Sequence, residues 1–121
     1  MTDDDAEAVS PLDVVLAFNE AWNAHDLDAV MALVADDCAF ESARPGANGD
    51  RLEGHDSLRA AWAPGFARAS GTFAFEETIL AGDRVVQLWR FGDGDDAVRG
   101  VDVLRVRDGQ IVEKLGYVKV R

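Results

Sequence analysis

Asp102 is the residue of this chain whose position most suggests chemistry. It lies inside Val101–Val106, a run typical of a β-strand, a few residues before the turn-forming pair Asp108-Gly109. An unpaired carboxylate is costly to bury. An acid in such a strand therefore faces water, pairs with a cation, takes up a proton or takes part in a reaction. Much of the function depends on which way Asp102 points.

The hairpin that follows determines what Asp102 meets. If its turn is a type I turn with a glycine bulge, Asp102 and Lys114 are cross-strand neighbours on one face. If it is a tight two-residue turn, Asp102 instead opposes Leu115, and Glu113 and Tyr117 join its face. An inward Asp102–Lys114 pair would favour the charged form of both groups. Asp102 would then be a charged anchor, or one half of a structural ion pair, rather than a proton donor.

Other familiar chemistry finds little support. His25 and His55 are isolated, and no spacing typical of a metal site occurs, so we expect no metal and no cofactor. The acids within 93–96 resemble the start of a calcium loop but lack the glutamate that should close it. Cys38 lies beside two acids, which disfavour a reactive thiolate, and we interpret it as a small core residue.

The chain has 121 residues and a net charge of −11, which fit one acidic globular domain. We expect a disordered acidic tail over residues 1–9 and a single domain over 10–121. The charge disfavours binding to nucleic acid or to an anionic membrane. No long apolar stretch or signal-like N-terminus occurs, so the cytoplasm is the expected location.

Helical periodicity comes first along the chain. Ser10 and Pro11 predict the start of a helix that runs to about Ala24. Asp26 predicts the cap of a second, shorter helix that ends at the two acids 36–37. A third helix is expected from about residue 55, with a break or kink at 64–65, where proline precedes glycine.

Strand patterns follow, joined by short turns. Helices followed by such a meander predict an α+β fold, with the helices on one face of a curved and mainly antiparallel sheet. The expected strands are Cys38–Ser42, Thr72–Leu80, Arg84–Phe91, Ala97–Arg107 and Gln110–Val120.

Three segments resemble SnoaL-like proteins of the nuclear transport factor two-like superfamily. They are 21–30 together with 33–37, which begin Ala-Trp-Asn-Ala-His-Asp, the helix start at 54–59, and 99–113 around Asp102. The resemblance extends over roughly residues 10–120. It implies a cone-shaped α+β barrel, with three N-terminal helices packed on a strongly bent, mainly antiparallel sheet around a pocket. It also implies a homodimer formed across the outer face of the sheet.

The superfamily includes ketosteroid isomerases and polyketide cyclases, and the resemblance can be tested residue by residue. In the isomerases a tyrosine and a protonated aspartic acid stabilise an enolate while a second aspartate moves the proton. Asp102 matches the late-strand acid. Phe18 occupies the position of the isomerase tyrosine, and Ser42 occupies the position of the general base. Glu41 is adjacent to Ser42, but its side chain should point to the other face of the strand. Classical isomerase chemistry is therefore not expected.

Two further family chemistries do not fit either. The cyclase-like members carry acids and a histidine on the last strand, but here no acid follows Glu113. Limonene epoxide hydrolases need an arginine and an aspartate on one face, whereas Arg99 and Asp102 should face opposite sides. The family alignment places Lys114 inward, and for that reason we favour the bulged hairpin.

The leading hypothesis is a pocket protein that binds a small, mostly apolar molecule and forms a homodimer. One alternative is an isomerase-, cyclase- or dehydratase-type enzyme, which would need a second titratable group within about 6 Å of Asp102. Another is a non-catalytic dimeric interaction module, with no cavity beyond about 100 Å³. Asp102 is the candidate catalytic residue. The candidate ligand-binding residues are Phe18, Trp22, Phe40, Ser42, Trp62, Trp89, Leu104, Lys114 and Tyr117.

Overall fold

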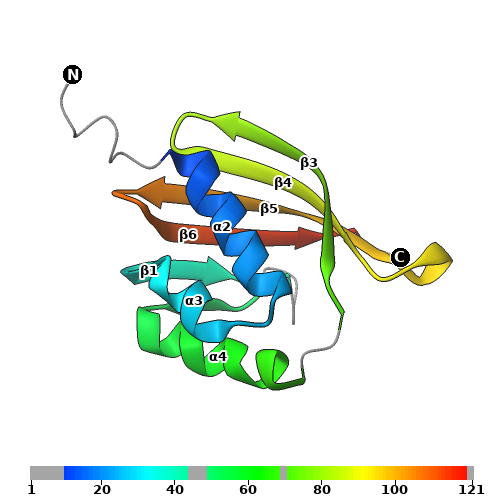
Figure 1. The fold of residues 1–121 in the computed structure, drawn as a ribbon, viewed down its shortest axis with the longest axis horizontal. Helices are drawn as coiled ribbons and strands as arrows, with labels where there is room; N and C mark the ends of the chain where they lie inside the picture. The colour runs from blue at the N-terminus through cyan, green and yellow to red at the C-terminus, as the bar shows by residue number, and fades with distance from the viewer. Residues whose placement is uncertain (1–9, 44–48, 69–70, 120–121) are drawn as a thin grey trace.

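A computed structural model of the chain describes residues 10–43, 49–68 and 71–119. Three α-helices and six strands make up most of these residues (Figure 1). The acidic tail expected over 1–9 lies outside the described residues. The elements in chain order are α2 Pro11–Asn23, α3 Leu27–Ala32, β1 Val34–Glu41, β2 Arg51–Glu53, α4 His55–Arg68, β3 Phe73–Ala81, β4 Arg84–Phe91, the 3-10 helix η1 Gly94–Asp96, β5 Val98–Arg107 and β6 Gln110–Val118.

Local signals start the first two helices as expected. The Ser10 hydroxyl accepts a hydrogen bond from the Asp13 backbone N–H at 3.1 Å, and a proline follows at the first position of α2. The Asp26 carboxylate accepts from the Ala29 N–H at 3.1 Å and caps α3. Each cap satisfies a backbone donor that has no partner within its helix.

Three features differ from what the sequence suggested, for tertiary reasons. The second helix ends at Ala32 and not at the acids 36–37, because Val34 already pairs with Ile111 in the sheet. Of the break or kink expected at Pro64, the break does not occur: α4 continues to Arg68, because Trp62 and Phe66 on both sides of the proline pack on the core. The short strand β2 was not expected, and its three residues pair with β1.

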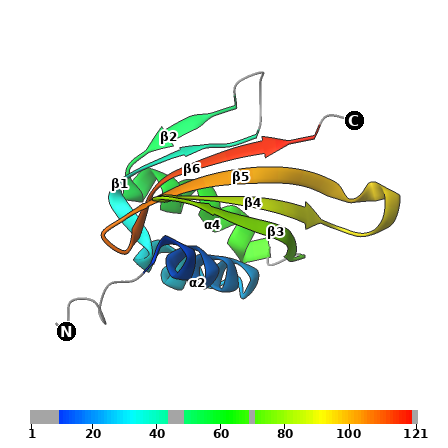
Figure 2. The same ribbon diagram turned by 90° about the horizontal axis from the view of Figure 1, so that it is seen from above.

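The six strands form one curled, mixed sheet in the order β2-β1-β6-β5-β4-β3. All neighbours are antiparallel except β1 and β6, which run parallel. The sheet does not close, since β2 and β3 are its two edges, so the expected barrel is an open curl. The helices lie together on one side of it (Figures 1 and 2).

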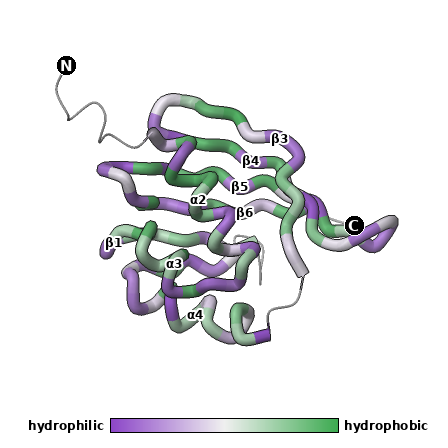
Figure 3. The backbone as a smooth tube through the Cα atoms, viewed as in Figure 1, coloured by the Kyte–Doolittle hydropathy of each residue, from purple (hydrophilic) through white to green (hydrophobic). Residues whose placement is uncertain are grey.

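The core lies between the helices and the concave face of the sheet. Side chains alternate along the strands, and Figure 3 shows hydrophobic stretches on α2 and on the strands behind it. The inward side chains of β4 are more buried than their outward neighbours: Val85, Gln87 and Trp89 are at most 7% exposed. Burial of this apolar surface drives the packing of helices onto the sheet. The core cluster is Val14, Val15, Phe18, Val30, Met31, Val34, Cys38, Leu58, Trp62, Val85, Leu104, Val106 and Ile111.

Candidate functional site

A hollow of about 370 Å³ opens on the concave side of the sheet, between the strands and the helices. This volume lies within the range of small-molecule pockets, about 300–1,000 Å³. Its wall is mostly aromatic, and its few polar groups come from the middle strands. It is lined by Trp22, Phe40, Ser42, Ala43, Trp62, Phe73, Trp89, Phe91, Val98, Asp102, Lys114, Gly116 and Val118.

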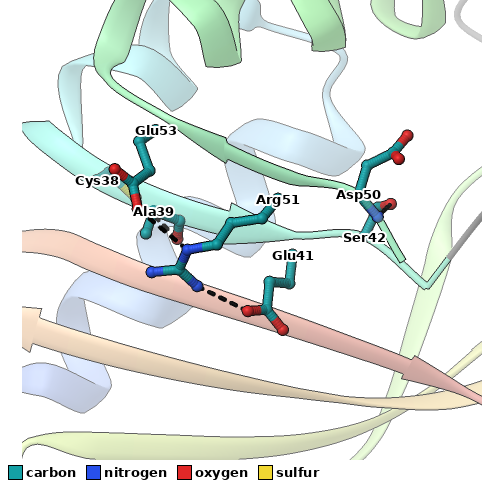
Figure 4. A network of polar contacts seen from close by, with 7 residues as sticks. All are labelled: Cys38, Ala39, Glu41, Ser42, Asp50, Arg51 and Glu53. Carbon is teal, nitrogen blue, oxygen red and sulfur yellow. Dashed lines mark hydrogen bonds and ion pairs between the residues drawn. The ribbon is translucent and has the colours of Figure 1, made fainter. Parts of the chain in front are cut away.

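Strand alternation selects which residues reach this hollow. Phe40 and Ser42 line it, whereas Glu41 between them pairs with Arg51 at 2.7 Å (Figure 4). The expectation that Glu41 points to the other face is thus confirmed. The Ser42 hydroxyl accepts a hydrogen bond from the Asp50 backbone N–H at 3.2 Å, so it helps to hold the end of β1 beside the residues before β2.

Asp102 and Lys114 form an ion pair on the wall of the hollow. The distance from Lys114 Nζ to Asp102 Oδ2 is 3.3 Å, and the two side chains are 12% and 14% exposed, respectively. The ammonium also lies over the rings of Trp22 and Phe40, at 5.3 and 5.1 Å from their centroids. Such ring faces are attractive to a cation. The lysine is therefore held from three sides.

The favoured bulged hairpin is confirmed in its facing, since Asp102 and Lys114 lie on one face, but the turn itself differs from the type I turn that was expected. Asp108 and Gly109 form a two-residue turn with φ of 53° and 77°, as in a type I′ hairpin. A bulge on β6 then follows, between the pairs Val106–Ile111 and Arg105–Glu113. Asp102 consequently opposes Gly116, and Lys114 lies diagonally across from it on the same face.

Aromatic rings build the rest of the wall. Trp22 is their centre: its ring centroid lies 4.9 Å from that of Trp62 and 4.8 Å from that of Phe66, both edge to face. Trp62 also meets Phe40 at 5.3 Å. On the β4 side, Trp89 lies across Gly100, where an added Cβ would collide with the indole ring and with a backbone oxygen. Gly100 therefore allows Trp89 to approach β5 closely.

Seven of the ten predicted site residues meet at this hollow, and three do not. Phe18 contacts a neighbouring cavity of only about 30 Å³. Leu104 is 1% exposed and belongs to the core cluster. Tyr117 is 56% exposed and, opposite Val101, lies on the outer face, because the β6 bulge reverses the facing expected for a tight hairpin. The seven predicted residues that line the hollow are Trp22, Phe40, Ser42, Trp62, Trp89, Asp102 and Lys114.

The prediction missed several wall residues. Phe73 and Phe91 are cross-strand partners on β3 and β4, and the alternation of hydrophobic residues along β4 was a signal that Phe91 faces inward. Gly116 was missed because a residue without a side chain carries no such signal. It sits directly opposite Asp102 in the register.

The remaining candidates have structural roles. Cys38 is fully buried, and this burial raises the pKa of its thiol to about 12, so the thiol is protonated at neutral pH. The His25 and His55 rings hydrogen-bond to the backbone oxygens of Gly71 and Met31, each at 2.9 Å. Within residues 10–43, 49–68 and 71–119, no three His, Cys, Asp or Glu side chains gather as a metal site would require.

Arg99 and Asp102 lie on opposite faces, as expected. Arg99 pairs with Glu76 at 2.9 Å on the outer face, so the arginine–aspartate arrangement of the epoxide hydrolases is absent. Across the part of the chain that the structure describes, no helix is both long and apolar enough to span a membrane.

Comparison with known proteins places these features in a family. The model of the SnoaL-like domain matches residues 15–114. An NTF2-like protein of unknown function from Mesorhizobium loti is 36% identical, with a TM-score of 0.80 and 91% of each chain covered. None of the curated proteins compared with the chain matches it.

Two more distant structures share the architecture. A SnoaL-like protein of unknown function from Burkholderia thailandensis is 25% identical, with a TM-score of 0.75 and coverage of 91% of this chain and 95% of that one. A computationally designed 17-OHP binder is 24% identical, with a TM-score of 0.74 and coverage of 93% and 94%. The similarity to the designed protein shows a shared fold and nothing further.

The ion pair yields a prediction about stability. Asp102→Asn or Lys114→Gln alone leaves one poorly hydrated charge without its partner, so each should lower the free energy of unfolding by about 3 kcal/mol. The double variant should lose less than the sum of the two, with a coupling of about 1–3 kcal/mol. Urea denaturation of the four proteins measures this coupling.

The exposed pair Arg59–Asp28 provides the control. Its atoms are 2.9 Å apart, but Asp28 is 87% exposed, so Arg59→Gln should change the stability by less than about 1 kcal/mol. Strict additivity of the Asp102 and Lys114 substitutions would mean that the two groups do not interact energetically.

Proposed function

The chain belongs to the SnoaL-like family, and on that premise we propose that its concave hollow binds a small, mostly apolar and preferably aromatic molecule. The observation that carries this proposal is the hollow of about 370 Å³ walled by aromatic rings, with a single ion pair among them. Edge-to-face contacts with a ligand ring would extend the ring contacts already present in the wall. A computationally designed protein of this fold binds 17-OHP, which supports the capacity of the fold to hold a small molecule.

The volume of the hollow argues against a non-catalytic interaction module whose aromatic residues fill the interior of the sheet. The interaction-module alternative required that no cavity exceed about 100 Å³. The hollow is several times larger, and Trp22, Trp62 and Trp89 border it instead of closing it.

Electrostatics favour a neutral ligand. The chain carries a net charge of −11, which repels anions. The one cation at the hollow, among the described residues, is Lys114, and Asp102 already neutralises it. A ligand with its own charge would have to disrupt that pair or lie beside it without a counter-ion.

A tryptophan substitution tests the binding proposal. Trp22→Leu removes the ring at the centre of the wall and should weaken the binding of a naphthalene-sized aromatic by about tenfold or more, since aromatic contacts and buried area are lost. The control is Leu16→Ala at an exposed position of α2 that lines neither hollow of the sheet, which should bind like the unmodified chain. Calorimetric titration measures both affinities, and no binding to any of the three proteins would refute the proposal.

Proton transfer is a second candidate function, favoured by one specific observation. An enzyme of this type needs a second titratable group within about 6 Å of Asp102, and Lys114 Nζ lies at 3.3 Å. Asp102 would be the acid–base group and Lys114 would stabilise the negative charge that develops on a ligand oxygen.

Isotope exchange tests this second function. With 2-acetonaphthone in D₂O, a proton-transfer site should speed the exchange of the methyl protons at least about a hundredfold over solution, as general acid–base catalysis does. Asp102→Asn should abolish the acceleration. NMR measures the exchange rate. If the bound ketone exchanges no faster than the ketone in solution, proton transfer is excluded and only the binding function stands.

We also propose that the outer face of the sheet forms a homodimer. A shallow hollow of about 330 Å³ there is bordered by Leu88, Val101 and Tyr117, and the tyrosine is 56% exposed. Apolar surface of this kind on the broad face of a sheet favours association. The flanking charges of Glu76, Arg99 and Lys119 would form a polar rim around it.

Sedimentation analysis at micromolar concentration tests the dimer. The unmodified chain should sediment as a dimer, and Val101→Glu should sediment as a monomer, because it buries an unpaired charge at the contact. Leu16→Glu is the control, since Leu16 is similarly exposed, at 49%, but lies on α2 on the opposite side of the sheet. A monomeric unmodified chain would refute the proposal.

A further inference from the structure

Gly116 leaves one oxygen of Asp102 open to the hollow. The two residues are direct cross-strand partners, and both line the hollow. A Cβ added at Gly116 would lie 3.4 Å from Asp102 Oδ1 and 3.4 Å from the backbone oxygen of Glu41. A side chain here would therefore cover the carboxylate oxygen that does not contact Lys114.

The backbone does not require glycine at this position. Gly116 is not among the glycines with positive φ, in contrast to Gly109 in the adjacent turn. It lies in regular strand β6, where glycine is normally unfavourable and often marks a close approach by another group. The feature that glycine provides at 116 is therefore space beside Asp102.

The two oxygens of Asp102 have different surroundings. Oδ2 faces Lys114 Nζ at 3.3 Å, and within the described ranges 10–43, 49–68 and 71–119 Oδ1 makes no ion pair or hydrogen bond. Oδ1 can therefore accept a hydrogen bond from a ligand.

Lys114 provides the complementary donor. An ammonium has three protons, and Asp102 occupies at most one direction around it. The rings of Trp22 and Phe40 cover part of the remainder without accepting a conventional hydrogen bond. A charged donor and a charged acceptor thus stand side by side on the wall of an aromatic hollow.

We propose that this pair recognises neutral aromatic molecules that carry a carbonyl oxygen next to an N–H group, such as primary aromatic amides and lactams, and that Gly116 determines this specificity. The carbonyl oxygen accepts from Lys114, and the N–H donates to Asp102 Oδ1. An ionised carboxylic acid fails in the second contact, because two carboxylates repel each other. The inference rests on the proposed binding function and assigns its ligand class.

Three ligands of nearly equal shape test it: 2-naphthamide, 2-acetonaphthone and 2-isopropylnaphthalene. The first has both the acceptor and the donor, the second only the acceptor, and the third neither. Hydrogen bonds to charged groups are among the stronger ones, so the amide should bind the unmodified chain about tenfold more tightly than the ketone. The ketone should in turn bind more tightly than the hydrocarbon. Calorimetric titration measures all three.

Gly116→Ala supplies the matched variant. The added methyl group covers Oδ1, so the amide should lose most of its advantage over the ketone, while the hydrocarbon should change by less than about threefold. Gly65→Ala on α4 is the control, since an added Cβ there lies no closer than 3.7 Å to a neighbouring group and Gly65 is not among the residues that line the hollow.

The outcomes separate this inference from the function on which it rests. Equal binding of the amide and the ketone to the unmodified chain would overturn the ligand class and leave the aromatic pocket intact. An amide advantage that persists in a folded Gly116→Ala protein would overturn the role of Gly116. If none of the three ligands binds, the proposed function itself fails. The comparison among ligands holds even if the variant does not fold.

Discussion

The facing of the side chains on β5 and β6 is the constraint on which the site depends. Successive strand residues point to opposite faces, so a shift of one residue would move Lys114 away from Asp102 and place Leu115 inside. A single bulge between the turn and Lys114 sets the observed facing. The bulge adds one residue to β6, so each β6 side chain after it points to the opposite face from the one it would have in a hairpin without the bulge. The ion pair, the open oxygen of Asp102 and the outward position of Tyr117 all follow.

Burial of the ion pair is tolerable because its surroundings are polarisable as well as apolar. Two opposite charges in a poorly hydrated place lose much hydration, and one close contact seldom compensates for that loss. Here the ring faces of Trp22 and Phe40 add a second attraction for the ammonium. The same rings belong to the wall of the hollow, so the contacts that hold Lys114 also shape the space beside it.

Much of the fold could be predicted because its signals are local. Ser10 and Asp26 cap helices through their immediate neighbours, and the Asp108-Gly109 pair selects its turn by its own conformational preference. The start of β1 could not be read in the same way. Val34 continues a helical pattern, and it joins the sheet only through pairing with Ile111, far along the chain. The strong bend of the sheet was expected from the family resemblance, whereas the order of its strands was not predicted.

The residues of the candidate site could be predicted wherever the sequence indicated which face of the sheet or helix a side chain occupies. Trp22, Phe40 and Trp89 were identified from residue type and periodicity, and they meet at the hollow. Tyr117 was placed inside in one of two open registers, and the β6 bulge, which no residue type announces, puts it outside. Gly116 escaped prediction for a different reason: its contribution is an absent side chain, visible only once Asp102 is seen opposite it.

The partner of Asp102 also decides what kind of chemistry the hollow can support. An aspartic acid that stabilises an enolate must be neutral and must donate a proton in a hydrogen bond. Lys114 at 3.3 Å is a partner for a carboxylate, which can only accept. Phe18 offers no hydroxyl to replace the missing donor. In this arrangement the donor at the hollow is the ammonium and the acceptor is the acid, the reverse of the isomerase assignment, so recognition of a polar ligand edge fits the residues better than the family's proton-transfer chemistry.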